Sequence, residues 1–185
     1  MLKAISSIVI KKDLFEINGK SQPLPENDGT LKGLMSAFYH SLNMSYPKFH
    51  KMDNLSKLGV IGVELLKQEH DLESYQDDAI ALHFQNASAS LDTDWVHQQN
   101  INEGKAASPA NFVYTLPNIV LGEIAIRNKW YGENLFTLAD QFDQDRWMKT
   151  NQVLVAQNKA EAVLGGWVEV LEEAFELELY FVAKE

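Results

Sequence analysis

Residues 108–134 read SPANFVYTLPNIVLGEIAIRNKWYGEN and enclose a long apolar segment, 116–129. Before Lys129 ends that segment, only Asn118, Glu123, Arg127 and Asn128 interrupt it, so apolar side chains would fall on nearly every side of a helix. Such a helix is expected to be buried on most sides. Glu123 and Arg127 stand four residues apart in the favourable order, so we expect them to form an ion pair.

Strand and helix patterns alternate around this segment. Apolar alternation and β-branched runs predict strands at 4–10, 79–86, 135–139, 162–170 and 177–182. Apolar periodicity predicts further helices at 31–42, 55–68, 90–100 and 142–157, with loops at 16–30 and 104–109. Asp53 or Asn54 is expected to cap the second of these helices. The alternation predicts an α/β fold with a mixed sheet packed with helices, in one domain covering 1–185.

Composition restricts the functional classes. The 185 residues carry 16 Lys and Arg against 26 Asp and Glu, a formal net charge of −10 at pH 7. Nucleic-acid binding needs a concentrated basic surface, so no nucleic-acid partner is expected. The chain has no cysteine, which excludes disulfides, thiolate metal sites and a cysteine nucleophile. This composition fits a reducing cytoplasm, the expected location.

The N-terminus begins with a short apolar run that Lys11 and Lys12 end. A signal peptide needs a longer apolar region, and a membrane span needs about 20 apolar residues. We therefore expect a first β-strand here and no membrane association.

No metal or cofactor site is expected from the sequence. The five histidines are His40, His50, His70, His83 and His97. None of them forms the His-x-x-x-His spacing that places two ligands on one helix face. Asp92, Asp94 and His97 look like a ligand cluster, but acidic residues in the first turn of a helix complement its dipole, which is the interpretation we favour.

Oxygen nucleophiles and phosphate loops give weak signals. Ser88, Ser90 and Ser108 lie in no Gly-x-Ser-x-Gly elbow. The glycines form no phosphate-cradling loop, and the pair Gly165-Gly166 within a strand predicts a bulge or a close backbone contact.

Three segments resemble β-ketoacyl synthases. In 108–134, the order of a proline, an aromatic residue, Asn118, Gly122, an Ala-Ile run and a further Gly resembles the segment that leads to the family's nucleophilic cysteine. Residues 84–94 resemble the strand and Ser-rich turn of ketosynthases, and 162–169 resemble their Val-x-Ala-Gly-Gly strand.

The likeness covers most of the chain and implies the N-terminal half of a thiolase-like fold. It implies a single β-ketoacyl synthase N-terminal-like domain. In particular, the chain is similar to the divergent ketosynthase-like proteins found with aryl polyene and flexirubin pigment genes.

Two departures bear on activity. In the family, the nucleophile lies nine residues after the Gly that opens its strand, and nine after Gly132 is Gln141. Glutamine also occupies that place in chain length factors. The family's two catalytic histidines come from its C-terminal half, whereas no histidine here follows His97. Because nucleophile and base act as a unit, the resemblance implies no condensation by this chain alone.

Four functions remain open at this point, one of them a purely structural role. The first is a non-catalytic partner, similar to a chain length factor, that binds a ketosynthase or a second copy. The second is a 3-oxoacyl-carrier-protein synthase subunit that works through Gln141 with a partner. The third is a module that binds an acyl group or an acyl carrier protein through Lys48, Lys51 and Lys57.

Association is expected because a lone half of this fold would expose part of an apolar layer. The helix at 116–129 is the expected member of that layer. In related enzymes, the strand after Gly132 borders the dimer interface. The expected interface residues are Trp130, Tyr131, Leu135, Phe136 and Leu138.

Overall fold

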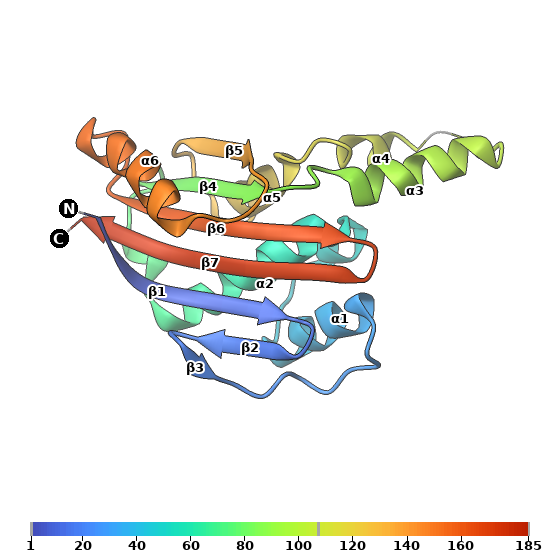
Figure 1. Cartoon of the computed structure of the whole chain (residues 1–185), viewed down its shortest axis with the longest axis horizontal. Helices are drawn as coiled ribbons and strands as arrows, with labels where there is room; N and C mark the ends of the chain where they lie inside the picture. Colours follow the sequence, from blue (N-terminus) through green and yellow to red (C-terminus); the bar gives the residue numbers. More distant parts are fainter. Residues whose placement is uncertain (1, 107, 185) are drawn as a thin grey trace.

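The computed structural model describes residues 2–106 and 108–184. Across these residues one seven-stranded mixed sheet has the order β3-β2-β1-β7-β6-β4-β5 (Figure 1). The strands are β1 (Leu2–Lys11), β2 (Leu14–Ile17), β3 (Lys20–Ser21), β4 (Ile80–Asn86), β5 (Asn134–Leu138), β6 (Ala162–Leu171) and β7 (Ala174–Lys184). The helices are α1 (Leu31–Ser41), α2 (Asn54–Glu69), α3 (Leu91–Asn102), α4 (Pro109–Val113), α5 (Ile119–Asn128) and α6 (Gln144–Ala156).

Helices cover the two faces of the sheet unequally. α1, α2 and α5 lie on one face, while α6 lies alone on the other (Figure 1). The larger apolar core fills the first face, where Ile61 of α2 and Leu179 of β7 are fully buried. A smaller cluster around Trp147 lies beneath α6. The expected mixed sheet packed with helices is therefore present.

Most of the expected elements are present, and the expected loop at 16–30 is partly wrong. Residues 14–17 form β2, which pairs antiparallel with β1, and 20–21 form β3. Asn18 and Gly19 between them both have positive φ, at 54° and 70°. This is the conformation that a two-residue Asn-Gly hairpin turn requires, so the sequence held a hairpin signal that the loop prediction missed.

The helix caps follow local side-chain chemistry. Asp53 caps α2 and accepts a hydrogen bond from the Ser56 amide at 3.0 Å. The additional helix α4 starts where loop was expected. Ser108 caps it and Pro109 takes its first position, a favourable arrangement because proline lacks the amide that would have no partner there. Residue 107 of that expected loop lies outside the described residues.

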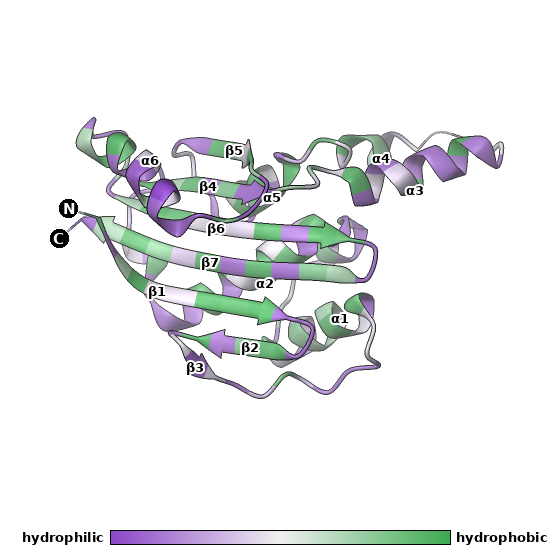
Figure 2. Ribbon diagram, viewed as in Figure 1, coloured by the Kyte–Doolittle hydropathy of each residue, from purple (hydrophilic) through white to green (hydrophobic). Residues whose placement is uncertain are grey.

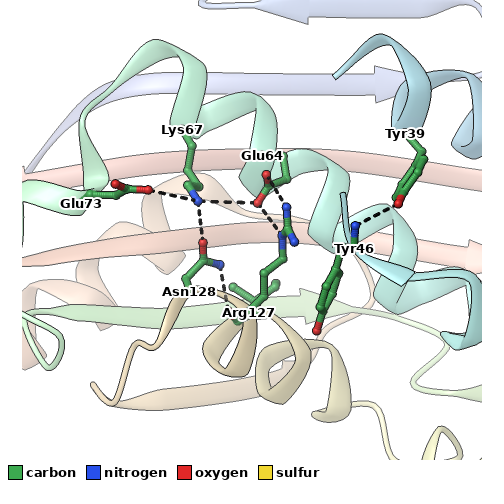
Figure 3. Close-up of polar contacts among 8 residues, drawn as sticks. Tyr39, Tyr46, Glu64, Lys67, Glu73, Arg127 and Asn128 are labelled. Atoms are coloured by element: carbon green, nitrogen blue, oxygen red, sulfur yellow. Dashed lines mark hydrogen bonds and ion pairs between the residues drawn. The ribbon is translucent and has the colours of Figure 1, made fainter. Parts of the chain in front are cut away.

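The expected ion pair between Glu123 and Arg127 is wrong. Arg127 instead forms two 2.9 Å hydrogen bonds with Glu64 on α2 and lies 4.5 Å from the ring centroid of Tyr46 (Figure 3). The buried Glu123 pairs with Lys48 at 2.7 Å and accepts a 2.9 Å hydrogen bond from the Tyr114 hydroxyl. Tertiary contacts therefore override the local pairing and bind α5 to α2.

Burial of α5 is also more one-sided than expected. Its Val120 and Ile124 are buried, but Ile126 is 66% exposed. The helix adjoins β5, as expected. It packs on α2 in the helical layer of the domain. The expectation that a partner covers the rest of this layer remains a prediction.

The open face of the sheet, beside α6, is polar rather than apolar. Glu176 and Glu178 of β7 lie there partly exposed, and Lys11 of β1 pairs with Glu176. Hydrophilic residues interrupt the apolar ones along β7 in Figure 2. This surface therefore gives no apolar motive for association. Separately, no helix in the described part is long and apolar enough to cross a bilayer.

The Gly165-Gly166 pair marks a close backbone contact, one of the two expected alternatives. Gly165 lies beside His83 in the parallel pairing of β4 with β6. A Cβ atom on Gly165 would lie 1.9 Å from the His83 carbonyl oxygen. Only glycine lets the two strands approach this closely.

We expect Gly165→Ala to lower the free energy of unfolding by about 3 kcal/mol, because a backbone carbonyl cannot move aside as a side chain can. Urea unfolding measures this change. Gly122→Ala is the matched control, since a Cβ atom there meets nothing within 4 Å. That helical substitution should stabilise the protein by about 0.5–1 kcal/mol. Equal effects of the two variants would contradict this account of Gly165.

Candidate functional site

A cleft lies at the carboxyl ends of the parallel strands β4 and β5, where the chain turns into α6. It encloses about 870 Å³. Its lining residues are His83, Gln85, Thr137, Leu138, Ala139, Asp140, Gln141, Asp143, Arg146 and Thr150. The strands fix the floor of the cleft, and the 139–143 loop with the first turns of α6 forms a wall.

His83 is the central polar group of this cleft. It is fully buried, on the same face of β4 as α6. Its Nδ1 lies 2.8 Å from Oδ1 of Asn151, and its Nε2 lies 3.1 Å from Oγ1 of Thr137. Both ring nitrogens therefore have partners, as a buried imidazole requires.

The partners of His83 define its tautomer. The amide nitrogen of Asn151 donates to the Trp147 carbonyl at 2.9 Å, so Oδ1 must face the imidazole. Since Oδ1 only accepts, the ring proton lies on Nδ1. Nε2 is then an acceptor, and the Thr137 hydroxyl donates to it. Gln85 Nε2 in turn donates to the Thr137 oxygen at 2.7 Å.

Trp147 fixes the position of α6 over His83. Its indole nitrogen donates to the His83 carbonyl at 3.0 Å, and its ring stacks on the imidazole with 5.9 Å between the centroids. Asp143 caps α6 by accepting from the Arg146 amide at 3.0 Å. One buried histidine thus joins β4, β5 and α6.

Burial also lowers the pKa of His83 from its ordinary value of 6.5, opposed only in part by the hydrogen bond to Asn151. The ring is therefore neutral at pH 7. Charged groups of the cleft, Asp140, Asp143 and Arg146, lie exposed at its rim. The buried part of the site is a chain of neutral donors and acceptors that can hold and pass one proton.

Gln141 lies exposed on the 139–143 loop and lines the same cleft. Its place at the end of β5, just before α6, is compatible with its expected alignment to the family nucleophile. That assignment remains a prediction.

The five expected interface residues divide into two groups. Trp130 is buried in the domain's own core, and Leu135 and Phe136 are partly buried, with Phe136 packed against that core. Tyr131 and Leu138 are 71% and 61% exposed. Within residues 2–106 and 108–184, β5 pairs with β4 alone and no strand lies along its outer edge.

The α3–α4 arm is a second exposed surface. These two helices project beyond the end of the sheet to which β4 and β5 point (Figure 1), and none of their residues is buried. Apolar residues occur along both helices (Figure 2). The exposed large apolar side chains of this region are Leu91, Trp95, Val96, Ile101, Phe112, Val113 and Leu116.

The candidate metal ligands do not converge. Asp92 accepts from the Glu172 amide and from Asn54, while a carboxylate oxygen of Asp94 lies 3.2 Å from the Ser90 hydroxyl oxygen. His97 lies against Phe112. Within residues 2–106 and 108–184, no group of three His, Asp or Glu side chains is placed to hold a metal ion. Asp92 and Asp94 occupy the first turn of α3, where they complement its dipole.

The serines have structural partners. The Ser90 hydroxyl donates to the Thr115 carbonyl at 2.7 Å, and Ser108 caps α4. The Ser88 amide, with that of Ala87, donates to the carboxylate of Glu169, which closes the turn after β4.

Sequence reasoning missed the polar chain through His83. The sequence pattern that points to it is weak. His83 and Gln85 alternate with apolar residues along one strand, and Thr137 lies on a second, parallel strand. Asn151 gave no signal, because only the packing of α6 places it beside the imidazole.

Comparisons with known proteins identify the fold. No protein-family model matches the chain, and no curated protein matches it. Among solved structures, a ketosynthase (ApeO) in complex with its chain length factor (ApeC) from Xenorhabdus doucetiae matches with a TM-score of 0.66, at 15% identity over 100% of this chain and 79% of the matched one. The ishigamide ketosynthase/chain length factor matches with a TM-score of 0.66, at 12% identity over 99% and 62%.

A β-ketoacyl synthase from Burkholderia phymatum matches with a TM-score of 0.64, at 9% identity over 100% of this chain and 59% of that one. The chain spans about three fifths of the length of the second and third structures. At these identities the likeness is one of fold. The expected thiolase-like fold is therefore confirmed.

We expect the His83 imidazole to titrate below pH 6.5 in the folded protein and to carry its proton on Nδ1. Nitrogen NMR of the ring measures both. Because the unfolded chain binds this proton more readily than the folded one, the contribution of His83 to stability is present above pH 6.5 and is lost as the pH falls toward the folded pKa. A titration at or above 6.5, or a proton on Nε2, would contradict the hydrogen-bond assignment.

Proposed function

We propose that this chain is a non-condensing partner of a ketosynthase, similar to a chain length factor, in fatty acid or polyketide-type biosynthesis of the aryl polyene kind. It would act in the cytoplasm, bind no cofactor and consist of one ketosynthase-like domain. The observation that carries the proposal is the unpaired edge of β5 in a thiolase-like fold.

The edge of β5 has the properties of a docking strand. No strand in the described part of the chain pairs with its outer backbone groups. Natural sheets usually cover such an edge or use it to bind partners. Tyr131 and Leu138 stand exposed before and at the end of this strand. A partner strand laid along β5 would extend the sheet and cover these side chains.

The α3–α4 arm supports the same proposal. Trp95 and Phe112 are more than half exposed, and neither helix buries any residue of its own. Aromatic side chains of this kind are enriched at interface hot spots. Since the arm leaves the body at the end where β5 also finishes (Figure 1), one partner can contact both. We therefore place the docking surface on β5 and the arm, not on the polar face beside α6.

Two of the similar structures are compatible with such a partner, because each contains a ketosynthase and a chain length factor. A third is an acyl carrier protein in complex with its ketosynthase. For this chain, the basic patch gives less support to carrier binding. Lys48 is engaged by the buried Glu123, and burial lowers the pKa of Lys57. Only Lys51 remains as an exposed cation without these constraints.

We expect Leu138→Asp to weaken association more than 100-fold, because the partner would bury an unpaired carboxylate at a cost of about 3 kcal/mol. Light scattering after co-expression with candidate ketosynthases measures the complex. Ile5→Asp is the matched control, an aliphatic residue that is 45% exposed on β1, and three strands lie between β1 and β5.

Circular dichroism must show native structure for both variants. The partner proposal would be overturned if the chain stayed monomeric at high concentration and bound none of the ketosynthases tested. If association survives Leu138→Asp but is lost with Ile5→Asp, the interface lies on the open face and not at β5.

We expect the purified chain to form no carbon–carbon bond between acyl and malonyl thioesters, because it has no cysteine and no histidine after His97. Product analysis by mass spectrometry checks this. The alternative, a catalytic subunit working through Gln141 with a partner, predicts condensation that disappears with Gln141→Ala. Gln141 is exposed, so this variant should fold normally.

A further inference from the structure

The Gln85–Thr137–His83–Asn151 chain has the arrangement of a nucleophile, a base and a group that orients the base. We propose that the Thr137 hydroxyl is an acyl acceptor, with His83 as its general base and Asn151 as the positioning residue, and that it acts on activated acyl esters and thioesters. Nucleophile–base–orienter constellations of this kind perform acyl transfer on many unrelated folds.

The donor and acceptor in each hydrogen bond of this network favour attack by Thr137. Gln85 donates to the Thr137 oxygen at 2.7 Å, so the hydroxyl proton is free to point at His83. His83 Nε2 is unprotonated because Asn151 holds the ring proton on Nδ1 at 2.8 Å. The hydroxyl therefore faces a lone pair 3.1 Å away, within reach for general-base catalysis.

Thr137 and His83 differ in solvent exposure, as acyl transfer requires of a nucleophile and its base. Thr137 is partly exposed and lines the cleft, whereas His83 is fully buried beneath it. A substrate carbonyl can reach the hydroxyl while Trp147 and the strands shield the imidazole. The cleft of about 870 Å³ has room for a short acyl chain.

The proposed step balances without any co-reactant except water. Thr137 Oγ1 forms a bond to the thioester carbonyl carbon, and its proton passes to His83 Nε2. The tetrahedral intermediate then breaks its carbon–sulfur bond, and the thiolate takes the proton from Nε2 and leaves as a thiol. Water attacks the threonyl ester in the same way, releases the carboxylic acid and restores the hydroxyl.

The electrostatics of His83 select the leaving group. Burial lowers the pKa of this ring, which makes it a weak base, and Asn151 has no charge with which to stabilise an imidazolium ion. Thiolates and phenolates leave with little protonation, whereas amines need a strong proton donor. The site therefore suits thioesters and aryl esters and not amides.

This inference goes beyond the proposed partner function and does not depend on it. Acyl transfer to a hydroxyl forms no carbon–carbon bond, and its readout is a covalent adduct rather than a complex. If no complex forms, the covalent adduct can still be measured, and if no adduct forms, the complex can still be measured. Each proposal can therefore fail without the other.

The test incubates the full chain with p-nitrophenyl acetate and with acetyl and hexanoyl thioesters of N-acetylcysteamine. We expect ester hydrolysis above the buffer rate and an acyl adduct on the peptide that contains Thr137, found by mass spectrometry after acid quench. Thr137→Val keeps the β-branched shape and should lower the rate at least about 100-fold. Thr137→Ser should restore it.

Thr115→Val is the control. The Thr115 hydroxyl donates to the Phe112 carbonyl on the arm, and Thr115 does not line the cleft. It should leave the rate unchanged. Asn151→Asp reports on positioning: its carboxylate would favour the imidazolium ion, so the pH at which the rate is half-maximal should rise. A merely structural asparagine would not move that profile.

Hydrolysis no faster than buffer, an adduct only on residues other than Thr137, or full activity in a folded Thr137→Val variant would overturn the proposal. Should Thr137→Val fail to fold, the location of the adduct in the unmodified sequence decides the question on its own.

Discussion

The buried imidazole of His83 constrains most of the structure around the cleft. It is bonded to Thr137 on β5 and Asn151 on α6, while its own carbonyl binds Trp147. The same carbonyl leaves no space for a side chain at Gly165, so β6 must carry a glycine where it passes β4. Removing one hydrogen-bond partner of His83 would leave a buried polar atom without a hydrogen bond, which costs about 1–3 kcal/mol of stability.

Because β5 is held from one side only, its other side is free. The strand is fixed to β4 by backbone pairing and to His83 by Thr137, yet nothing in the described residues pairs with its outer edge. The polar face beside α6, with Glu176 and Glu178, is adapted to water. The apolar surface lies instead at the edge strand and the arm, which is why we place a partner there.

The sequence predicted the elements that local patterns control. Asp53, one of the two residues expected to cap α2, the strand at 79–86 and the close contact at the glycine pair of β6 all follow from neighbouring residues. The missed features depend on distant ones. Arg127 bonds to Glu64 rather than to Glu123, because α2 brings a carboxylate with bidentate geometry to it. The cleft was not predicted. The resemblance singled out Gln141 only by its spacing from Gly132, and the contact of His83 with Asn151 joins residues 68 positions apart.

Hydrogen exchange of the β5 and α3–α4 amides, measured in the isolated chain and in a purified complex with a ketosynthase, tests the central claim most directly. The account predicts that residues 134–138 and the arm exchange quickly in the isolated chain and become protected in the complex, while the open face of β1 and β7 does not change. Protection confined to the open face, or a complex in which β5 and the arm exchange as in the free chain, would contradict it.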